Sequence, residues 1–212
     1  MKLDILAFSA HPDDIEISCG GTIIKQIQLG KNVGIVDLTQ GELGTRGSAD
    51  LRLIESNKAS KLLGLSIREN LKMEDGFFDD SKKNKLKVVS AIRKYKPDVV
   101  LANSIYDRHP DHGRGSKLVS DSCFLAGLSK VLTFEDNEAQ NAWRPKTIYH
   151  YIQDYYIKPD FIVDISDVIN HKIDCIQAYK TQFWDPQSNE PETPISGIEF
   201  FDFIKARARE YG

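Results

Sequence analysis

Hydrophobic and polar positions follow two different patterns along the chain. Short apolar runs bounded by glycine, proline or charged residues are typical of buried strands, and apolar residues three or four apart are typical of amphipathic helices. The first pattern predicts strands at residues 3–10, 33–39, 70–73, 98–103, 147–153 and 161–165. The second predicts helices at residues 15–29, 50–64, 81–95, 113–132, 168–179 and 198–211.

The predicted strands and helices alternate through the first two thirds of the chain. Such alternation is typical of an α/β fold, in which a mostly parallel sheet is covered by helices on both faces. We expect a Rossmann-like, doubly wound sheet with the strand order 3-2-1-4, in which the first and fourth strands are neighbours. A chain of 212 residues is long enough for one well-filled core, so we expect a single domain over residues 1–212.

Two of the predicted strands end in nearly the same polar segment. The first strand leads into His-Pro-Asp-Asp at residues 11–14, and the fourth is followed by His-Pro-Asp-His at residues 109–112. The carboxyl ends of neighbouring parallel strands open into one crevice. The predicted topology therefore brings three histidines and three aspartates together.

This combination of imidazoles and carboxylates suits a catalytic metal ion. A catalytic zinc is held by two or three imidazoles and a carboxylate, with one position open for water, and Fe²⁺ accepts the same donors. We assign His11, Asp14 and His112 as the metal ligands. Asp13 is left over and is well placed to take a proton from the attacking water as general base. His109 could stabilise the oxyanion or help to protonate the leaving amine.

Some of these residues have alternative interpretations. Asp107 or Asp111 could hold the second nitrogen of His109. Aspartates that follow a strand often cap the next helix, so Asp13 or Asp14 could have that structural role instead. The presence of two such segments at converging strand ends favours the metal site.

Composition and charge argue against several classes of protein. The formal net charge of −3 argues against a sequence-independent nucleic-acid binder. No apolar run approaches the ~20 residues of a membrane-spanning helix, and the N-terminus lacks the apolar core of a signal peptide. We therefore expect a cytoplasmic protein with no nucleic-acid or membrane partner. The sequence does not determine the oligomeric state of the protein, and a homo-oligomer is one of the alternatives.

Three motifs resemble those of a known family. AHPDD after the first strand, TRG in the loop after the second and HPDH after the fourth are similar to motifs of the PIG-L or LmbE-like family of zinc-dependent N-deacetylases. The resemblance implies a Rossmann-like fold with zinc held by His11, Asp14 and His112. It also implies a general base at Asp13 and an auxiliary histidine at His109, in agreement with the assignment from the residues alone.

The resemblance further implies arginines near the substrate. Arg46 in the TRG loop and Arg52 in the following helix match the family pattern. Arg108 is another candidate for binding substrate carboxylates, because its guanidinium group offers a fixed fork of donors. For Arg52 the alternative is an ion pair with Glu55 or Glu42 on the helix face.

Two further segments, YHYIQDYYIKPDFIVDIS and AYKTQF, resemble those of bacillithiol-biosynthesis deacetylases. The resemblance implies a small-molecule sugar conjugate as the substrate, N-acetyl-alpha-D-glucosaminyl L-malate, which loses its N-acetyl group. The alternative substrates are other N-acetylglucosamine-type sugars, such as chitobiose or a mycothiol-like conjugate. A phosphoesterase would more often use two metals and more carboxylates. A nucleotide-binding regulator would need the glycine-rich turn that is missing after the first strand.

Overall fold

The computed structural model describes all residues from 1 to 212. Its main sheet has five strands, all parallel, in the order β3-β2-β1-β4-β7. These strands are β1 (Ile5–Ser9), β2 (Val33–Thr39), β3 (Ile67–Met73), β4 (Val99–Ala102) and β7 (Thr147–His150). The predicted α/β class and the order of the first four strands are confirmed.

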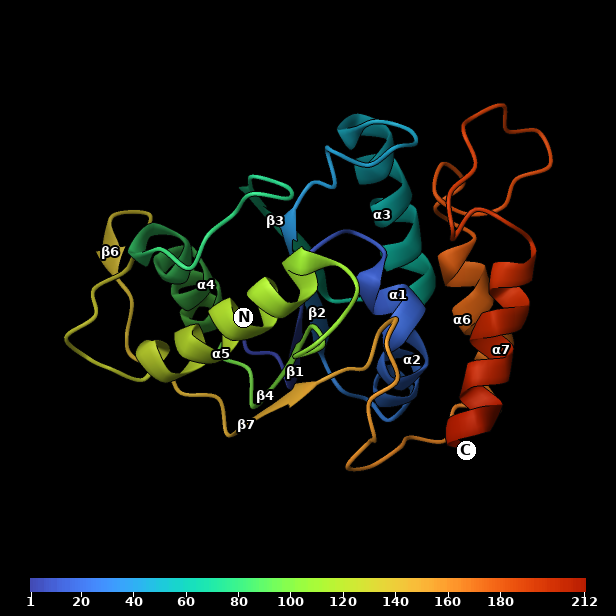
Figure 1. Ribbon diagram of the computed structural model, residues 1–212. Coiled ribbons are helices and arrows are strands. Elements are labelled where there is room, and N and C mark those ends of the chain that lie inside the picture. The colour runs from blue at the N-terminus through green and yellow to red at the C-terminus, as the bar shows by residue number, and fades with distance from the viewer.

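Helices cover both faces of the main sheet (Figure 1). One face carries α4 (Lys82–Tyr95) and α5 (Pro110–Ala126). The other carries α1 (Asp14–Ser18), α2 (Gly20–Gln28) and α3 (Ala49–Leu63), and α6 (Ile169–Ile176) and α7 (Glu199–Tyr211) lie outside these three helices. A short antiparallel ribbon, β5 (Phe134–Glu135) with β6 (Glu138–Ala139), follows α5. No helix combines the length and the apolar character needed to cross a membrane.

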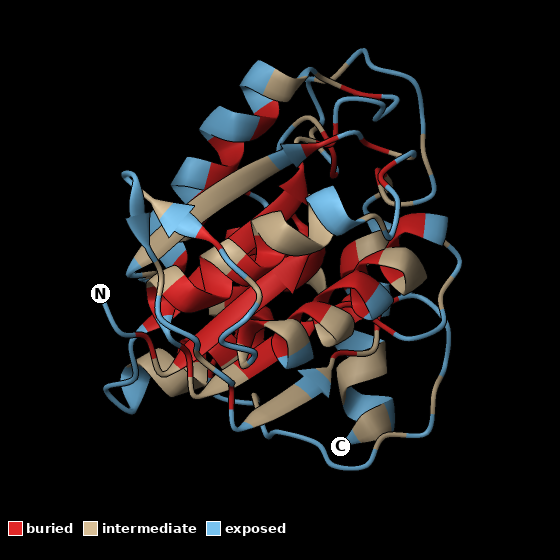
Figure 2. Ribbon diagram, turned by 90° about the vertical axis from the view of Figure 1, so that its left-hand side faces the viewer, coloured by how far each residue is buried: buried red, intermediate tan, exposed pale blue.

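The adjacent strands β1 and β2 are buried along their whole length, and buried strands appear as red ribbons in the middle of Figure 2. Successive side chains of a strand point to opposite faces of the sheet. Accordingly, Phe8 and Leu38 pack into the cluster formed with α4 and α5, whereas Ala7 and Ile35 pack into the cluster formed with α1 and α2. Burial on both faces explains why these strands appear in the sequence as continuous apolar runs.

The helix predicted at residues 15–29 is two helices. The chain leaves helical geometry at Cys19, where φ is −113° and ψ is 15°. Gly20 and Gly21 follow directly, and glycine favours a helix interior less than other residues do. Because of this break, α1 is a short helix. It starts at Asp14, the last residue of the His-Pro-Asp-Asp segment.

The helix predicted at residues 113–132 begins earlier and ends earlier, at Pro110 and Ala126. Proline suits the first turn of a helix because its missing N–H would have no partner there. His109 is the N-cap, and its side chain accepts a hydrogen bond from the backbone N–H of Asp111. The polar segment at residues 109–112 is therefore part of a helix start and not a free loop.

The strand predicted at residues 161–165 is wrong. This stretch belongs to an irregular segment, residues 151–168, that leads from β7 to α6. Ile162 and Val163 are exposed, and Ile165 packs so closely over Gly21 that a Cβ there would approach its side chain to 2.8 Å. An apolar run held by one such contact has the same appearance in the sequence as a buried strand.

Candidate metal centre

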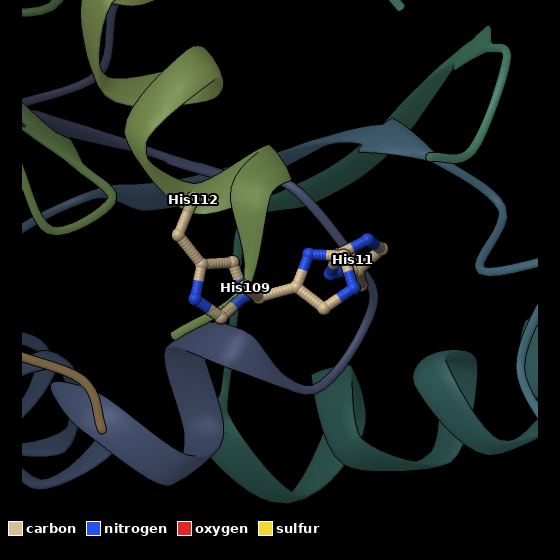
Figure 3. Close-up of side chains that lie close together, drawn as sticks. All are labelled: His11, His109 and His112. Carbon is tan, nitrogen blue, oxygen red and sulfur yellow. The ribbon is translucent and has the colours of Figure 1, made fainter. Parts of the chain in front are cut away.

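The polar segments after β1 and β4 meet at the carboxyl edge of the sheet. His11 comes from the first segment, and His109 and His112 come from the start of α5 (Figure 3). The ring of His11 lies 4.6 Å from that of His109 and 5.6 Å from that of His112, measured between centroids. One ring nitrogen of each histidine lies within 4.8 Å of the others, so the predicted convergence is present in the structure.

The carboxylate of Asp14 lies between His11 and His112. Its Oδ2 is 3.7 Å from Nδ1 of His11, and its Oδ1 is 3.1 Å from Nε2 of His112. Four ligands at zinc bond lengths of about 2.0–2.1 Å in a tetrahedron lie roughly 3.4 Å from one another. The two separations involve different oxygens of Asp14 and lie on either side of this value, so this carboxylate lies close enough to each histidine to share a metal ion with it.

The hydrogen bonds of His112 leave a metal-binding nitrogen facing Asp14. Nδ1 of His112 lies 2.5 Å from Oδ2 of Asp107 and donates its proton to that carboxylate. The lone pair of Nε2 then faces Oδ1 of Asp14, with the side-chain amide nitrogen of Gln153 3.3 Å from the same ring nitrogen, and a cation between the two acceptors would relieve their repulsion. Without a metal, that cation is a proton: burial opposes the charge, but Asp14 and Asp107 outweigh it and raise the pKa of His112 to about 9.

His11 also has a carboxylate behind its ring. Nε2 of His11 lies 3.0 Å from Asp75 and 3.4 Å from Asp111, on the side away from Asp14. Burial opposes protonation of this ring, but the three carboxylates outweigh it and raise the pKa of His11. A carboxylate on the outer nitrogen of a histidine is typical of metal sites, because it fixes the tautomer and makes the inner nitrogen more basic. Asp75, in the loop after β3, was not predicted.

Two amides that the sequence analysis missed hold the carboxylate of Asp14. Asn103, just after β4, donates to Oδ2 at 3.0 Å, and Gln153, just after β7, donates to Oδ1 at 3.1 Å. Burial raises the pKa of Asp14, but His112 and His11 outweigh it and hold this pKa well below its usual range. Asn103 and Gln153 follow strand ends, which is the signal that could have identified them, but amides carry no charge or metal-ligand signature.

Asp13 points to a different partner from Asp14. It precedes α1 but makes no side-chain capping hydrogen bond, so the capping interpretation is wrong for this residue. Its φ of 124° is unusual for a residue with a side chain and indicates local backbone strain. Burial raises the pKa of Asp13 to about 7, and the nearby Arg52 opposes this increase.

Arg52 is the residue that holds this strained turn. Its Nη1 donates to Oδ2 of Asp13 at 3.1 Å and to the carbonyl of Pro12 at 3.0 Å. The alternative ion pair with Glu55 or Glu42 is wrong, because Arg52 pairs with Asp13 instead.

His109 is oriented by the start of its own helix. Its Nδ1 accepts the hydrogen bond from the backbone of Asp111, so the neutral ring carries its proton on Nε2. Burial and the nearby His11 and His112 lower the pKa of His109 and favour this neutral form. The expectation that the carboxylate of Asp107 or Asp111 holds His109 is wrong, since Asp107 binds His112 and the carboxylate of Asp111 faces His11.

The metal centre opens into a cavity of about 1740 Å³. Arg52 and Arg108 line it, and Nε of the exposed Arg108 donates to Asp154 at 3.2 Å. Arg46 is buried outside the cavity lining, and its Nη2 donates to Ser188 at 2.5 Å. Of the three predicted substrate arginines, the structure therefore places two at the cavity and one in a contact with the loop before α7.

A parallel sheet with imidazoles and carboxylates gathered at its carboxyl edge defines an α/β protein whose residues can hold a metal ion. Residues 6–123 match the PIG-L family, described as GlcNAc-PI de-N-acetylase. The chain belongs to this family and is an N-deacetylase.

Individual relatives agree with this assignment. The diacetylchitobiose deacetylase of Thermococcus kodakarensis is 30% identical over 86% of this chain and 73% of its own length. A conserved protein of Thermus thermophilus has a similar structure, with a TM-score of 0.86 and 35% identity over 99% of this chain and 88% of its own. The N,N'-diacetylchitobiose deacetylase of Pyrococcus horikoshii gives a TM-score of 0.81 and 28% identity over 98% of this chain and 78% of its own.

Proposed function

We propose that the protein is a zinc-dependent deacetylase that removes the N-acetyl group from N-acetyl-alpha-D-glucosaminyl L-malate. His11, Asp14 and His112 would hold the metal, and Fe²⁺ is the alternative ion for the same donors. The observation that carries the proposal is the pair of acceptors formed by Asp14 and His112, 3.1 Å apart and both fixed from behind by hydrogen bonds.

Asp13 has the placement that a general base requires. When bound, the metal would polarise the acetamide carbonyl and make water more acidic. Arg52 engages Oδ2 of Asp13, so the other carboxylate oxygen has no protein partner and can accept the proton of the attacking water. Asp13 would then pass this proton to the nitrogen of the departing sugar amine. The strain at Asp13 fits this role, because unusual backbone geometry is often found at catalytic groups.

His109 would stabilise the charge that develops on the acetyl oxygen. Its Nε2 carries the proton in the neutral ring and is free of protein partners, since Nδ1 is the atom that contacts Asp111. A preorganised donor of this kind is worth about 2.7–4 kcal/mol of transition-state stabilisation. The tautomer also argues for a donor and against a fourth metal ligand, because a protonated nitrogen cannot bind a metal.

The conjugate with malate is the finer part of the proposal. Its acidic aglycone fits a cavity that carries the arginines Arg52 and Arg108 and extends well beyond the metal centre. The resemblance of two chain segments to bacillithiol enzymes points to the same substrate. The relatives that act on diacetylchitobiose support the alternative, in which the second sugar takes the place of malate.

The experiment is an acetate-release assay on the purified protein reconstituted with Zn²⁺ or Fe²⁺. N-acetylglucosaminyl malate and N,N'-diacetylchitobiose are compared as substrates, and metal content is measured on the same samples. We expect about one metal per chain and a higher kcat/KM for the malate conjugate. A preference for diacetylchitobiose would favour the alternative substrate, and no acetate from either sugar would contradict the proposed function.

A further inference from the structure

The cavity continues past the metal centre along one side of α1 and the start of α2. Asp14, Ser18 and Thr22 line it in succession, four residues apart in the sequence. At a rise of about 1.5 Å per residue, Ser18 lies about 6 Å further along the helix than Asp14. The irregular segment of residues 151–168, the first turn of α6 and one side of α7 supply further parts of the lining. The cavity therefore has a second end that the proposed chemistry does not use.

A buried lysine lies at this second end. Lys172, in the first turns of α6, is 5% exposed and lines the cavity. Its Nζ donates to the backbone carbonyl of Ser18 at 3.1 Å, and no carboxylate lies within 4 Å of it. The hydroxyl of Ser18 is buried and has no hydrogen-bond partner. The ammonium group thus has a hydrogen bond but no counter-ion, and the hydroxyl beside it lacks the partner that a buried polar group normally has.

A second cation lines the same cavity. Arg207, in the last turns of α7, lines the cavity and donates to the backbone carbonyls of Asp154 and Tyr155 at 3.1 and 3.2 Å. Like Lys172, it has no carboxylate partner within ion-pair distance. Burial lowers the pKa of Lys172 to about 8; Cys19 opposes this decrease and Arg207 adds to it. A buried cation without a counter-ion is costly, and an anion bound in the cavity would relieve that cost.

We propose that Lys172 and the hydroxyl of Ser18, with Arg207 in the lining of the same cavity, form a subsite for a carboxylate of the substrate's aglycone. This inference rests on the proposed function and deepens it. The acetamide lies at the metal centre, the sugar ring lies along α1, and the aglycone carboxylate meets the ammonium group at the far end. Arg108 is the less suitable partner, because it is exposed at the rim and already paired with Asp154.

The test is a change of specificity in Lys172→Met. Methionine keeps most of the side-chain volume and removes the charge, so the fold should be retained. Relative to the wild type, we expect kcat/KM for N-acetylglucosaminyl malate to fall at least tenfold, and kcat/KM for the uncharged N,N'-diacetylchitobiose to stay within twofold. Lys180→Met, an exposed lysine outside the cavity lining, is the matched control and should change neither value. An equal loss on both substrates, or no loss on either, would overturn the subsite.

A binding measurement separates this inference from the proposed function. L-malate is titrated into the zinc-loaded wild type and into zinc-loaded Lys172→Met, so that any contact of malate with the metal is the same in both. We expect the Kd to rise at least tenfold in the variant. If neither sugar is deacetylated but malate binding still depends on Lys172, the proposed function fails and the anion subsite stands. If deacetylation proceeds and malate binds both proteins equally, the subsite is wrong.

Discussion

Oδ2 of Asp107 lies 2.5 Å from Nδ1 of His112, and this contact determines which nitrogen of the ring faces Asp14. In Asp107→Asn the amide can offer an N–H to Nδ1, which would move the ring proton to Nε2 and block metal binding. Loss of an outer carboxylate of this kind costs about 10–100-fold in metal affinity. We therefore expect zinc affinity to fall by that factor, measured by competition with a chromophoric chelator.

The matched control for this change is Asp154→Asn. Asp154 is an acidic residue at the rim of the same cavity, where it pairs with Arg108 and does not contact His112. Its substitution should leave zinc affinity unchanged. Equal affinities for wild type and Asp107→Asn would show that the tautomer of His112 is not set by Asp107.

Substitutions of the neighbouring residues Asp13 and Asp14 should differ in their effects on metal content and on kcat. Asp14 contacts both proposed histidine ligands, whereas Asp13 contacts Arg52. We expect Asp14→Ala to lose its metal. Asp13→Asn should keep about one metal per chain and lose a factor of about 10²–10⁴ in kcat, as expected for removal of a general base. Metal analysis and acetate release on the same preparations check this, and full activity of Asp13→Asn would rule out its proposed role.

Arg52 should act through Asp13 and only secondarily through the substrate. Its guanidinium group donates to both the carboxylate of Asp13 and the carbonyl of Pro12. It thereby holds the turn in which Asp13 has the unusual φ of 124°. We expect Arg52→Met to lower kcat about 100-fold with little change in KM, since a displaced base slows the reaction without weakening binding. A higher KM at an unchanged kcat would instead assign Arg52 to substrate binding, as the family resemblance implies. Steady-state kinetics on the malate conjugate distinguish the two.

Substitution of His109 should lower the reaction rate and leave the metal content unchanged. Nδ1 of His109 accepts a hydrogen bond from Asp111, which leaves a proton on Nε2 and makes this ring a donor. For His109→Ala we expect a loss of about 10²–10³ in kcat, the usual effect of removing an oxyanion donor, with metal content unchanged. Loss of the metal in this variant would instead make His109 a ligand, since its ring lies close to those of His11 and His112.

The sequence contains enough information to predict where the site forms. Right-handed crossovers leave few ways to order four parallel strands, so the polar ends of β1 and β4 could be expected to meet. This expectation is confirmed by the strand order and by the distances between His11 and the histidines of α5. Cytoplasmic location and oligomeric state stay predictions, because neither depends on contacts within one chain.

The supporting residues of the site could not be predicted in the same way. Gln153 reaches Asp14 only because β7 pairs with β4, although α5, a small β-ribbon and irregular stretches separate these strands in the sequence. Asp75 comes from the loop after β3, a strand that does not neighbour β4, and reaches His11 through the fold of that loop. Such contacts depend on loop geometry, which hydrophobic periodicity does not encode.

The free energy of unfolding should depend on pH through Lys172. Its pKa is about 8 in the folded protein against an ordinary value of 10.5, so the unfolded chain binds the proton more tightly. The contribution of Lys172 therefore destabilises the fold below pH 8, and it disappears as the pH rises from about 8 to about 10.5. Lys172→Met lacks this penalty, and at pH 7 it should be more stable than the wild type by about 3 kcal/mol.

Urea unfolding of both proteins at pH 7 and pH 10 measures the difference in the free energy of unfolding. This difference should shrink at the higher pH, because the other titrating groups are common to both proteins. A difference that is the same at both pH values would show that the Lys172 ammonium is not penalised by burial.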